Sequence, residues 1–183
     1  EREHVTTQHF KTAGDSVLLL GNPGEDLGAS HYVLTATGQK LGSPPTIDLL
    51  AESRLQDALR SLIRMGLIRS AHDLSEGGLG VALCEAAFGP DGTLGCQISL
   101  EALGGSAAGL LFNEAPTRVL VTVGRSNASA VEALLTWRGI PVHRLGTVTG
   151  EARASIVLPE GSTSWDLDAL RTAYESVLPT AMR

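Results

Sequence analysis

The chain has 183 residues, of which 43% are hydrophobic and 19% are charged, and this size and composition fit one globular domain that can bury its own core. Fourteen Lys plus Arg against twenty Asp plus Glu give a formal net charge of −6 with scattered basic residues, which argues against a nucleic-acid partner. No apolar run approaches the roughly 20 residues of a membrane span, and the N-terminus has no signal-peptide core. The sequence therefore predicts a single domain over residues 1–183, located in the cytoplasm and without a membrane partner.

The first half of the chain predicts one buried strand, a long helix, and a short strand that leads into a second helix. Residues 16–20 form an apolar run closed by a Gly/Pro turn, which is typical of a strand at the centre of a sheet. The clearest helix has Asp48 as its N-cap and Gly66 as its stop signal. Residues 67–71 then predict a brief strand, and a turn over residues 72–78 begins the next helix. This alternation indicates an α/β domain.

Strands and helices also alternate in the second half. A β-branched strand at residues 118–123, a helix over 127–138 capped by Asn127, and a strand over 141–148 predict a crossover unit. Residues 101–109 read as a loop or a short helix. Further strands are expected at residues 95–100 and 152–158, and a terminal helix has an apolar face of Leu167, Leu170, Tyr174, Val177 and Leu178. The predicted fold is an α/β domain with a mixed β-sheet of about five or six strands and packed helices.

The two cysteines, Cys84 and Cys96, have the spacing of neither a disulfide scaffold nor a zinc site. Small apolar residues surround Cys84 at helical spacing, so a buried helix explains it better than a nucleophile does. We therefore predict that both cysteines are reduced core residues.

The sharpest candidate site is the turn between the predicted strand and the second helix. Adjacent glycines at Gly77 and Gly78 let the main chain approach a ligand, and the helix N-terminus offers free N–H groups to a phosphate. Asp73 could hold a Mg²⁺ that bridges phosphate oxygens. The alternative is that Asp73 or Ser75 caps the helix while the glycines only permit close packing. We expect a structural role for the neighbouring His72.

A second candidate site lies in the turn before the strand at residues 118–123. Glu114 could accept a hydrogen bond from a substrate amine or a ribose hydroxyl, and Arg118 could hold a phosphate with two N–H groups. The alternative is an ion pair between these two side chains, which is common in surface loops. The sequence contains neither a P-loop nor a dinucleotide-binding glycine pattern.

Three segments, in this order and at this spacing, resemble a known family. They are residues 18–21 with 26–32, residues 71–83, and residues 111–114 with Arg118. Over roughly residues 10 to 155 the chain resembles the C-terminal domain of the aminoimidazole ribonucleotide (AIR) synthetase superfamily. The segment at 26–32 favours its phosphoribosylformylglycinamidine synthase branch over the hydrogenase-maturation, thiamine-phosphate kinase and selenophosphate synthetase branches. A sister-family synthetase or kinase remains an alternative.

The resemblance implies an AIR synthase C-terminal fold and an ATP-dependent amidation in purine biosynthesis. In that reaction the formamide oxygen of formylglycinamide ribonucleotide is phosphorylated and then displaced by ammonia from glutamine, with ATP/ADP and Mg²⁺ as cofactors. The resemblance implies no catalytic residue in this chain. It places a metal-binding acid at Asp73, nucleotide or phosphate contacts at Ser75, Glu76, Gly77 and Gly78, and counterparts of substrate-binding residues at Asn113, Glu114 and Arg118.

The resemblance also implies partners. They are a preceding ATP-binding domain of the same chain, a glutaminase subunit and a small accessory subunit. Because the chain opens on Glu1 rather than Met, we expect it to be a piece of a larger multidomain polypeptide, and because it ends at Arg183 shortly after its final helix, we expect it to be the last domain. The isolated chain, which lacks the ATP-binding domain, is then expected to be inactive. A structural or interaction role without a ligand is the alternative.

Overall fold

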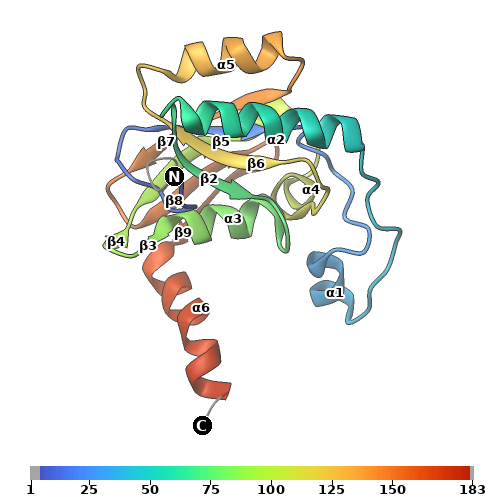
Figure 1. The fold of residues 1–183 in the computed structure, drawn as a ribbon. Coiled ribbons are helices and arrows are strands. Elements are labelled where there is room, and N and C mark those ends of the chain that lie inside the picture. The colour runs from blue at the N-terminus through green and yellow to red at the C-terminus, as the bar shows by residue number, and fades with distance from the viewer. Residues whose placement is uncertain (1–4, 182–183) are drawn as a thin grey trace.

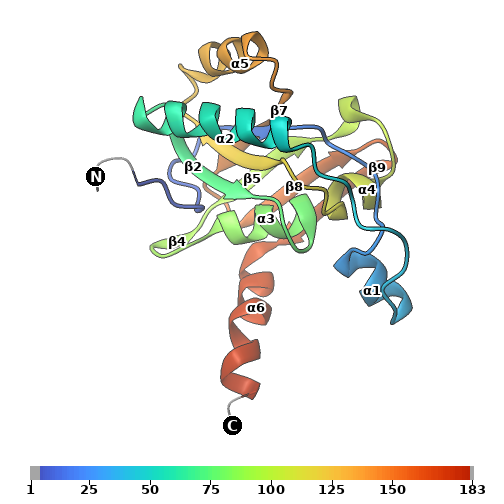
Figure 2. The ribbon, with the colours of Figure 1, turned by 45° about the vertical axis from the view of Figure 1, so that its right-hand side comes forward.

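A computed structural model describes residues 5–181 and places most of them around one seven-stranded sheet (Figures 1 and 2). Its strands are β1 (Ser16–Leu20), β2 (Ile68–Asp73), β5 (Gly95–Ser99), β6 (Val119–Val123), β7 (Val142–Thr149), β8 (Arg153–Leu158) and β9 (Gly161–Asp166). Their spatial order is β2-β6-β1-β7-β5-β8-β9, and every neighbouring pair is antiparallel except β5 with β8. The sheet is therefore mixed, as predicted. A separate hairpin joins β3 (Phe88–Gly89) to β4 (Gly92–Thr93).

Helices cover both faces of this sheet (Figure 1). The helices α2 (Leu49–Arg64) and α5 (Ala128–Trp137) pack on one face, and α3 (Gly78–Ala87) and α4 (Ala107–Phe112) pack on the other. The short α1 (His31–Thr37) lies to one side, and α6 (Leu167–Ala181) projects away from the body. None of the helices in the described part combines the length and the apolar character needed to cross a membrane.

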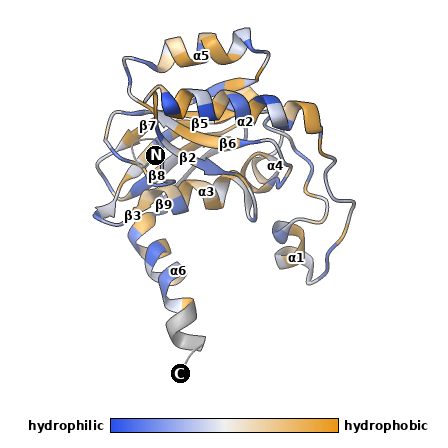
Figure 3. Cartoon of the chain, viewed as in Figure 1, coloured by the Kyte–Doolittle hydropathy of each residue, from blue (hydrophilic) through white to orange (hydrophobic). Residues whose placement is uncertain are grey.

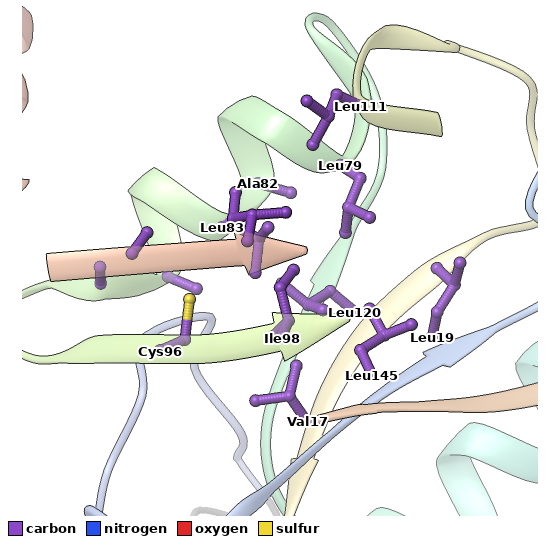
Figure 4. Close-up of a cluster of buried hydrophobic side chains, with 14 of the residues drawn as sticks. Val17, Leu19, Leu79, Ala82, Leu83, Cys96, Ile98, Leu111, Leu120 and Leu145 are labelled. Carbon is purple, nitrogen blue, oxygen red and sulfur yellow. The ribbon is translucent and has the colours of Figure 1, made fainter. Parts of the chain in front are cut away.

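The central strand β1 shows why the two faces need separate cores. All five of its residues are buried, and it pairs with β6 on one side and β7 on the other. Its side chains alternate, so Val17 and Leu19 join the core under α3 (Figure 4), while Leu18 and Leu20 join the core under α2 and α5. A strand covered on both faces requires a continuous apolar run. The prediction of a central buried strand is confirmed.

The two ends of α2 follow the predicted chemistry. The carboxylate of Asp48 accepts hydrogen bonds from the main-chain N–H groups of Leu50 and Ala51, at 2.9 and 3.1 Å. At the other end the chain leaves the helix through Gly66, whose φ of 69° favours glycine. Along its length α2 alternates polar and apolar residues, and Figure 3 shows this mixture of colours. The helix therefore packs Leu55, Ala58 and Leu62 against the sheet, whereas Leu49 and Leu50 in its first turn are exposed.

The predicted crossover unit is confirmed, and the structure shows in addition that β1 lies between its two strands. Both β6 and β7 run antiparallel to β1, so they are parallel to each other and β1 lies between them. The helix α5 makes the connection. Asn127 occupies its N-cap position but makes no side-chain capping bond.

Several predicted boundaries need correction. The sheet has seven strands rather than five or six, because β9 was not predicted: it carries no alternating apolar pattern and forms the exposed edge beside β8. The strand β2 extends to Asp73, two residues beyond the prediction. The segment after β5 contains a 3-10 turn at Glu101–Leu103 followed by α4.

The terminal helix is present, but its apolar face is not buried as a whole. Leu167 is fully buried, whereas Leu170, Tyr174 and Val177 are exposed. The side chain of Leu178 lies outside the described part of the structure. The apolar face is therefore fully buried only at the start of the helix, although the exposed Tyr174 still contacts the body, with its ring centroid 5.8 Å from that of Phe88.

Candidate functional site

The three sequence segments that carry the resemblance meet at the side chain of Glu114. Its Oε1 accepts hydrogen bonds from the main-chain N–H of Gly77 at 2.8 Å and of His31 at 2.9 Å. The imidazole Nδ1 of His31 lies 3.3 Å from the same oxygen. One carboxylate therefore joins the start of α1 to the turn before α3, although these segments are far apart in sequence.

The environment of Glu114 favours its ionised form. The side chain is only 16% exposed, and burial by itself raises the pKa of the carboxyl. The hydrogen bonds from Gly77 and His31, together with the imidazole, outweigh burial and hold the pKa below its ordinary value. Glu114 is therefore a charged, internally bonded group at neutral pH.

Arg118 is buried and bound by the main chain. Its guanidinium donates from Nε to the carbonyl of Ala115 at 3.0 Å, from Nη1 to that of Pro23 at 2.8 Å, and from Nη2 to that of Asn113. Burial lowers the pKa of Arg118 to about 10. The predicted alternative of an ion pair between Glu114 and Arg118 is wrong, because each group is bonded elsewhere. In this structure Arg118 holds the loop after β1 against the start of β6.

Asn113 has a similar internal role. Its amide group donates to the carbonyl of Asp26 at 2.6 Å, and its amide oxygen accepts from the N–H of Ala115 at 2.8 Å. The residue is buried. It therefore ties residues 26–32 to the end of α4 and has no exposed group of its own.

The turn before α3 is closed by main-chain contacts. Gly77 is the N-cap of α3 with a φ of 78°, and no side chain caps this helix, so the prediction of Asp73 or Ser75 as its cap is wrong. The N–H of Gly78 donates to the carbonyl of Ser75 at 3.1 Å, while that of Gly77 is bonded to Glu114. A carboxylate of the chain therefore lies where an anion at this helix N-terminus would lie.

Two acids at the same end of α3 point into solvent. The side chains of Asp73 and Glu76 are 80% and 82% exposed. Imidazole nitrogens of His72 and His31 lie 3.6 Å from Asp73 and 4.0 Å from Glu76, respectively. Among the described residues no three His, Cys, Asp or Glu side chains form a metal-binding group. One exposed carboxylate nevertheless suits Mg²⁺, which keeps several waters and takes phosphate oxygens as further ligands.

His72 has the structural role expected for it. Its Nε2 lies 2.8 Å from the Oε2 of Glu85 on α3, and the side chain is almost fully buried. The other oxygen of Glu85 accepts from the hydroxyl of Tyr174 on α6, at 3.1 Å. This acid thus connects β2, α3 and α6.

The two cysteines are free, as predicted, but only Cys96 is a buried core residue, because Cys84 is half-buried at the edge of the core. Burial raises the pKa of Cys84 to about 11 and that of Cys96 to about 12. Both thiols are therefore protonated at neutral pH, which disfavours a nucleophilic role.

Sequence reasoning missed the part played by His31 and Tyr32. The ring of Tyr32 stacks on Phe112, with centroids 5.1 Å apart and planes 11° apart. Together with the bonds from His31 to Glu114, this stack fixes α1, which buries none of its own residues. The signal in the sequence was the motif at residues 26–32, but the motif alone did not reveal which side chains it contacts.

Fold and site together define a class of protein. Residues 12–159 match the family described as AIR synthase related protein, C-terminal domain, and the chain belongs to this family. The chain is 42% identical over 164 residues to the phosphoribosylformylglycinamidine synthase subunit PurL of Symbiobacterium thermophilum. The matched region covers 88% of this chain and 21% of that protein. It is 40% identical over 169 residues to PurL of Thermus thermophilus, covering 92% of the chain and 22% of that protein. The chain thus spans about a fifth of the length of these relatives.

Solved structures show the same fold. Thermotoga maritima PurL complexed with FGAR superposes with a TM-score of 0.78 at 20% identity, covering 91% of this chain and 29% of that one. The hydrogenase maturation protein HypE of E. coli gives a TM-score of 0.62 at 22% identity, covering 89% of this chain and 52% of that one. The predicted α/β fold of the AIR synthase C-terminal type is confirmed.

Proposed function

We propose that this chain is a domain of a phosphoribosylformylglycinamidine synthase, a cytoplasmic ligase of purine biosynthesis. The full enzyme would convert formylglycinamide ribonucleotide, ATP and ammonia derived from glutamine to formylglycinamidine ribonucleotide. The identity of 40% or more to two PurL subunits, over nine-tenths of the chain, supports this assignment. The observation that carries the site is the convergence of three motifs on one carboxylate, Glu114.

For the cofactors, we propose ATP or ADP together with Mg²⁺. T. maritima PurL has been solved in complexes with ATP, ADP and AMPPCP. In this chain the exposed carboxylate of Asp73 would be the protein ligand of the metal, with Ser75 and Glu76 beside the phosphates. When bound, Mg²⁺ supplies positive charge that neutralises phosphate oxygens.

We assign the remaining residues of the cluster to positioning. Glu114, Asn113 and Arg118 have their polar groups bonded to His31 and to the main chain, so they hold the loops in place. The Gly77–Gly78 turn would let a phosphate lie close to the main chain, beside the Gly77 N–H that Glu114 already binds. The chemistry itself would belong to other parts of the enzyme.

Partners follow from the same assignment. A structure of PurLQS from Thermotoga maritima superposes on this chain with a TM-score of 0.73. We propose an ATP-binding domain preceding this one in the same polypeptide, a glutaminase subunit and a small accessory subunit. This domain would be the last of the polypeptide, and the 183 residues alone would form no product from substrate, ATP, Mg²⁺ and ammonia.

A scaffold without a ligand is the second candidate, and the occupied N–H of Gly77 is the observation that favours it. Asp73→Ala in the natural polypeptide separates the two functions, with Asp91→Ala, an exposed acid in the β3–β4 hairpin, as the matched control. Loss of bound nucleotide and of turnover at an unchanged melting temperature supports the ligand role. Unchanged nucleotide content and unchanged turnover in Asp73→Ala favour the scaffold.

A further inference from the structure

The outward face of α3 is apolar although it faces solvent. The inward residues Leu79, Ala82 and Leu83 belong to the core beneath the helix (Figure 4). On the outward side a groove of about 420 Å³ is lined mainly by apolar side chains, including Val81, Cys84, Phe112, Trp165, Leu170 and Tyr174. Glu85 is the one charged residue of α3, and a helix that is apolar on nearly all sides is normally buried on all sides. The outward face of α3 therefore has the character of a surface that another element covers.

Among the described residues, the groove has no unpaired charge. Glu85 is the one Asp, Glu, Lys or Arg among the lining residues in this part of the chain. The two oxygens of this carboxylate bind the imidazole of His72 and the hydroxyl of Tyr174. A charged peptide would therefore find no free partner for its own charges in the groove, whereas an apolar surface would leave the existing bonds intact.

The apolar stripe of α6 continues the groove outward. Leu170 and Tyr174 line the groove, and Val177, one turn further along α6, is 63% exposed. Figures 1 and 2 show this helix projecting from the body, and Figure 3 shows apolar and polar residues along its projecting part. Isolated helices of this length are marginal in water without packing of their apolar face. The groove and this stripe together form one surface, which we call the α3–α6 face.

We propose that the α3–α6 face packs against an apolar surface of a neighbouring domain in the same, longer polypeptide. The inference rests on the proposed function, because the matched region is only 21 to 22% of the PurL relatives and four-fifths of their length lies outside it. The position of the groove also favours this occupant. Phe112 lines the groove and stacks on Tyr32, which follows His31 in α1. A domain seated on the groove would therefore reach the exposed acids at the start of α3 and complete a site that this chain only begins.

Photo-crosslinking in the natural full-length polypeptide tests the proposal. The substitution Val81→p-benzoylphenylalanine places a photoreactive group in the groove, and Trp137→p-benzoylphenylalanine, on the exposed end of α5, is the matched control. We expect Val81 to cross-link to residues of the same polypeptide outside these 183, with at least a tenfold higher yield than the control. Cross-links between isotopically light and heavy copies would indicate a second copy as the occupant and overturn the proposal, as would the absence of protein cross-links.

A second measurement covers the case in which the bulky substitution disturbs packing. Hydrogen exchange of the unmodified polypeptide is expected to be at least 100-fold slower than random coil in the Leu170–Val177 turns of α6. Exchange within tenfold of random coil there would contradict docking of the helix. A polypeptide that makes formylglycinamidine ribonucleotide yet shows no cross-links refutes the docking alone. A natural polypeptide no longer than these 183 residues refutes the proposed function.

Discussion

Removing the carboxylate of Glu114 is expected to release the start of α1 from the turn before α3. A hydrogen bond to a charged group contributes about 1.5–3 kcal/mol, and Glu114 accepts two from main-chain N–H groups. The side chain is 16% exposed, so water replaces part of this interaction in Glu114→Ala, and we expect a local loss of about 2–4 kcal/mol. Glu114→Gln keeps an acceptor oxygen without the charge and should lose only about 1 kcal/mol.

Native-state hydrogen exchange measures this loss at the two amides themselves. Because 1.4 kcal/mol corresponds to a factor of ten, the amides of His31 and Gly77 should exchange roughly 30 to 700 times faster in Glu114→Ala. Glu76→Gln is the matched control, since this acid is 82% exposed and binds no main-chain N–H in the described structure. Equal exchange rates at both amides in the wild type and in Glu114→Ala would refute the assignment of Glu114 as the junction.

The pH dependence has a defined sign. The pKa of Glu114 is lower in the folded protein than its ordinary value of 4.5. At a pH between these two pKa values, the unfolded state therefore binds more protons than the folded state. The stabilisation is fully present above pH 4.5 and is lost as the pH falls through the folded pKa. Protection of the His31 amide should therefore decrease on acidification below pH 4.5, and this dependence should be weaker in Glu114→Gln.

Three further substitutions probe other parts of the fold. Arg118→Met should lower the free energy of unfolding by about 3 kcal/mol in urea titration, because three carbonyl oxygens lose a buried charged donor; full stability would contradict the bracing role. Asp15→Asn should raise the melting temperature at pH 7, because burial raises the pKa of Asp15 and its ionisation therefore destabilises the fold. An unchanged or lower melting temperature would contradict this reasoning. Leu18→Ala should cost about 2–5 kcal/mol by the same titration, since Leu18 is fully buried in the core under α2; a loss under 1 kcal/mol would contradict that placement.

Local sequence signals were sufficient for much of the fold. The buried run of β1 and the Asp48 cap of α2 each depend on residues within a few positions of one another, so a single window of sequence predicts them. The edge strand β9 has no such local signal, because its residues are mostly polar. It is a strand because it pairs with β8. The partial exposure of α6 also depends on what lies nearby in space and not on its regular apolar spacing.

The candidate site was predictable as a set of residues but not as a set of contacts. Motif order identified the segments that meet at Glu114. The bond to His31 crosses 83 positions of sequence, and the partners of Arg118 are carbonyl groups that every residue possesses. Neither kind of contact can be predicted from the residue types alone. For this reason the sequence favoured an ion pair between Glu114 and Arg118, and only the three-dimensional structure shows that each group has other partners.

The charges around the start of α3 lead to a last prediction. Asp73, Glu76 and Glu114 place three carboxylates at one end of this helix, and Glu114 takes the N–H of Gly77 that would otherwise attract an anion. A nucleotide phosphate arriving alone would therefore be repelled, whereas Mg²⁺ between phosphate and Asp73 would convert repulsion into attraction. In the natural polypeptide, removing Mg²⁺ with EDTA should lower ADP affinity at least tenfold, and Asp73→Asn should abolish most of this difference. Equal ADP affinity with and without Mg²⁺ would exclude a phosphate site at this turn and would leave the three motifs with a purely structural role.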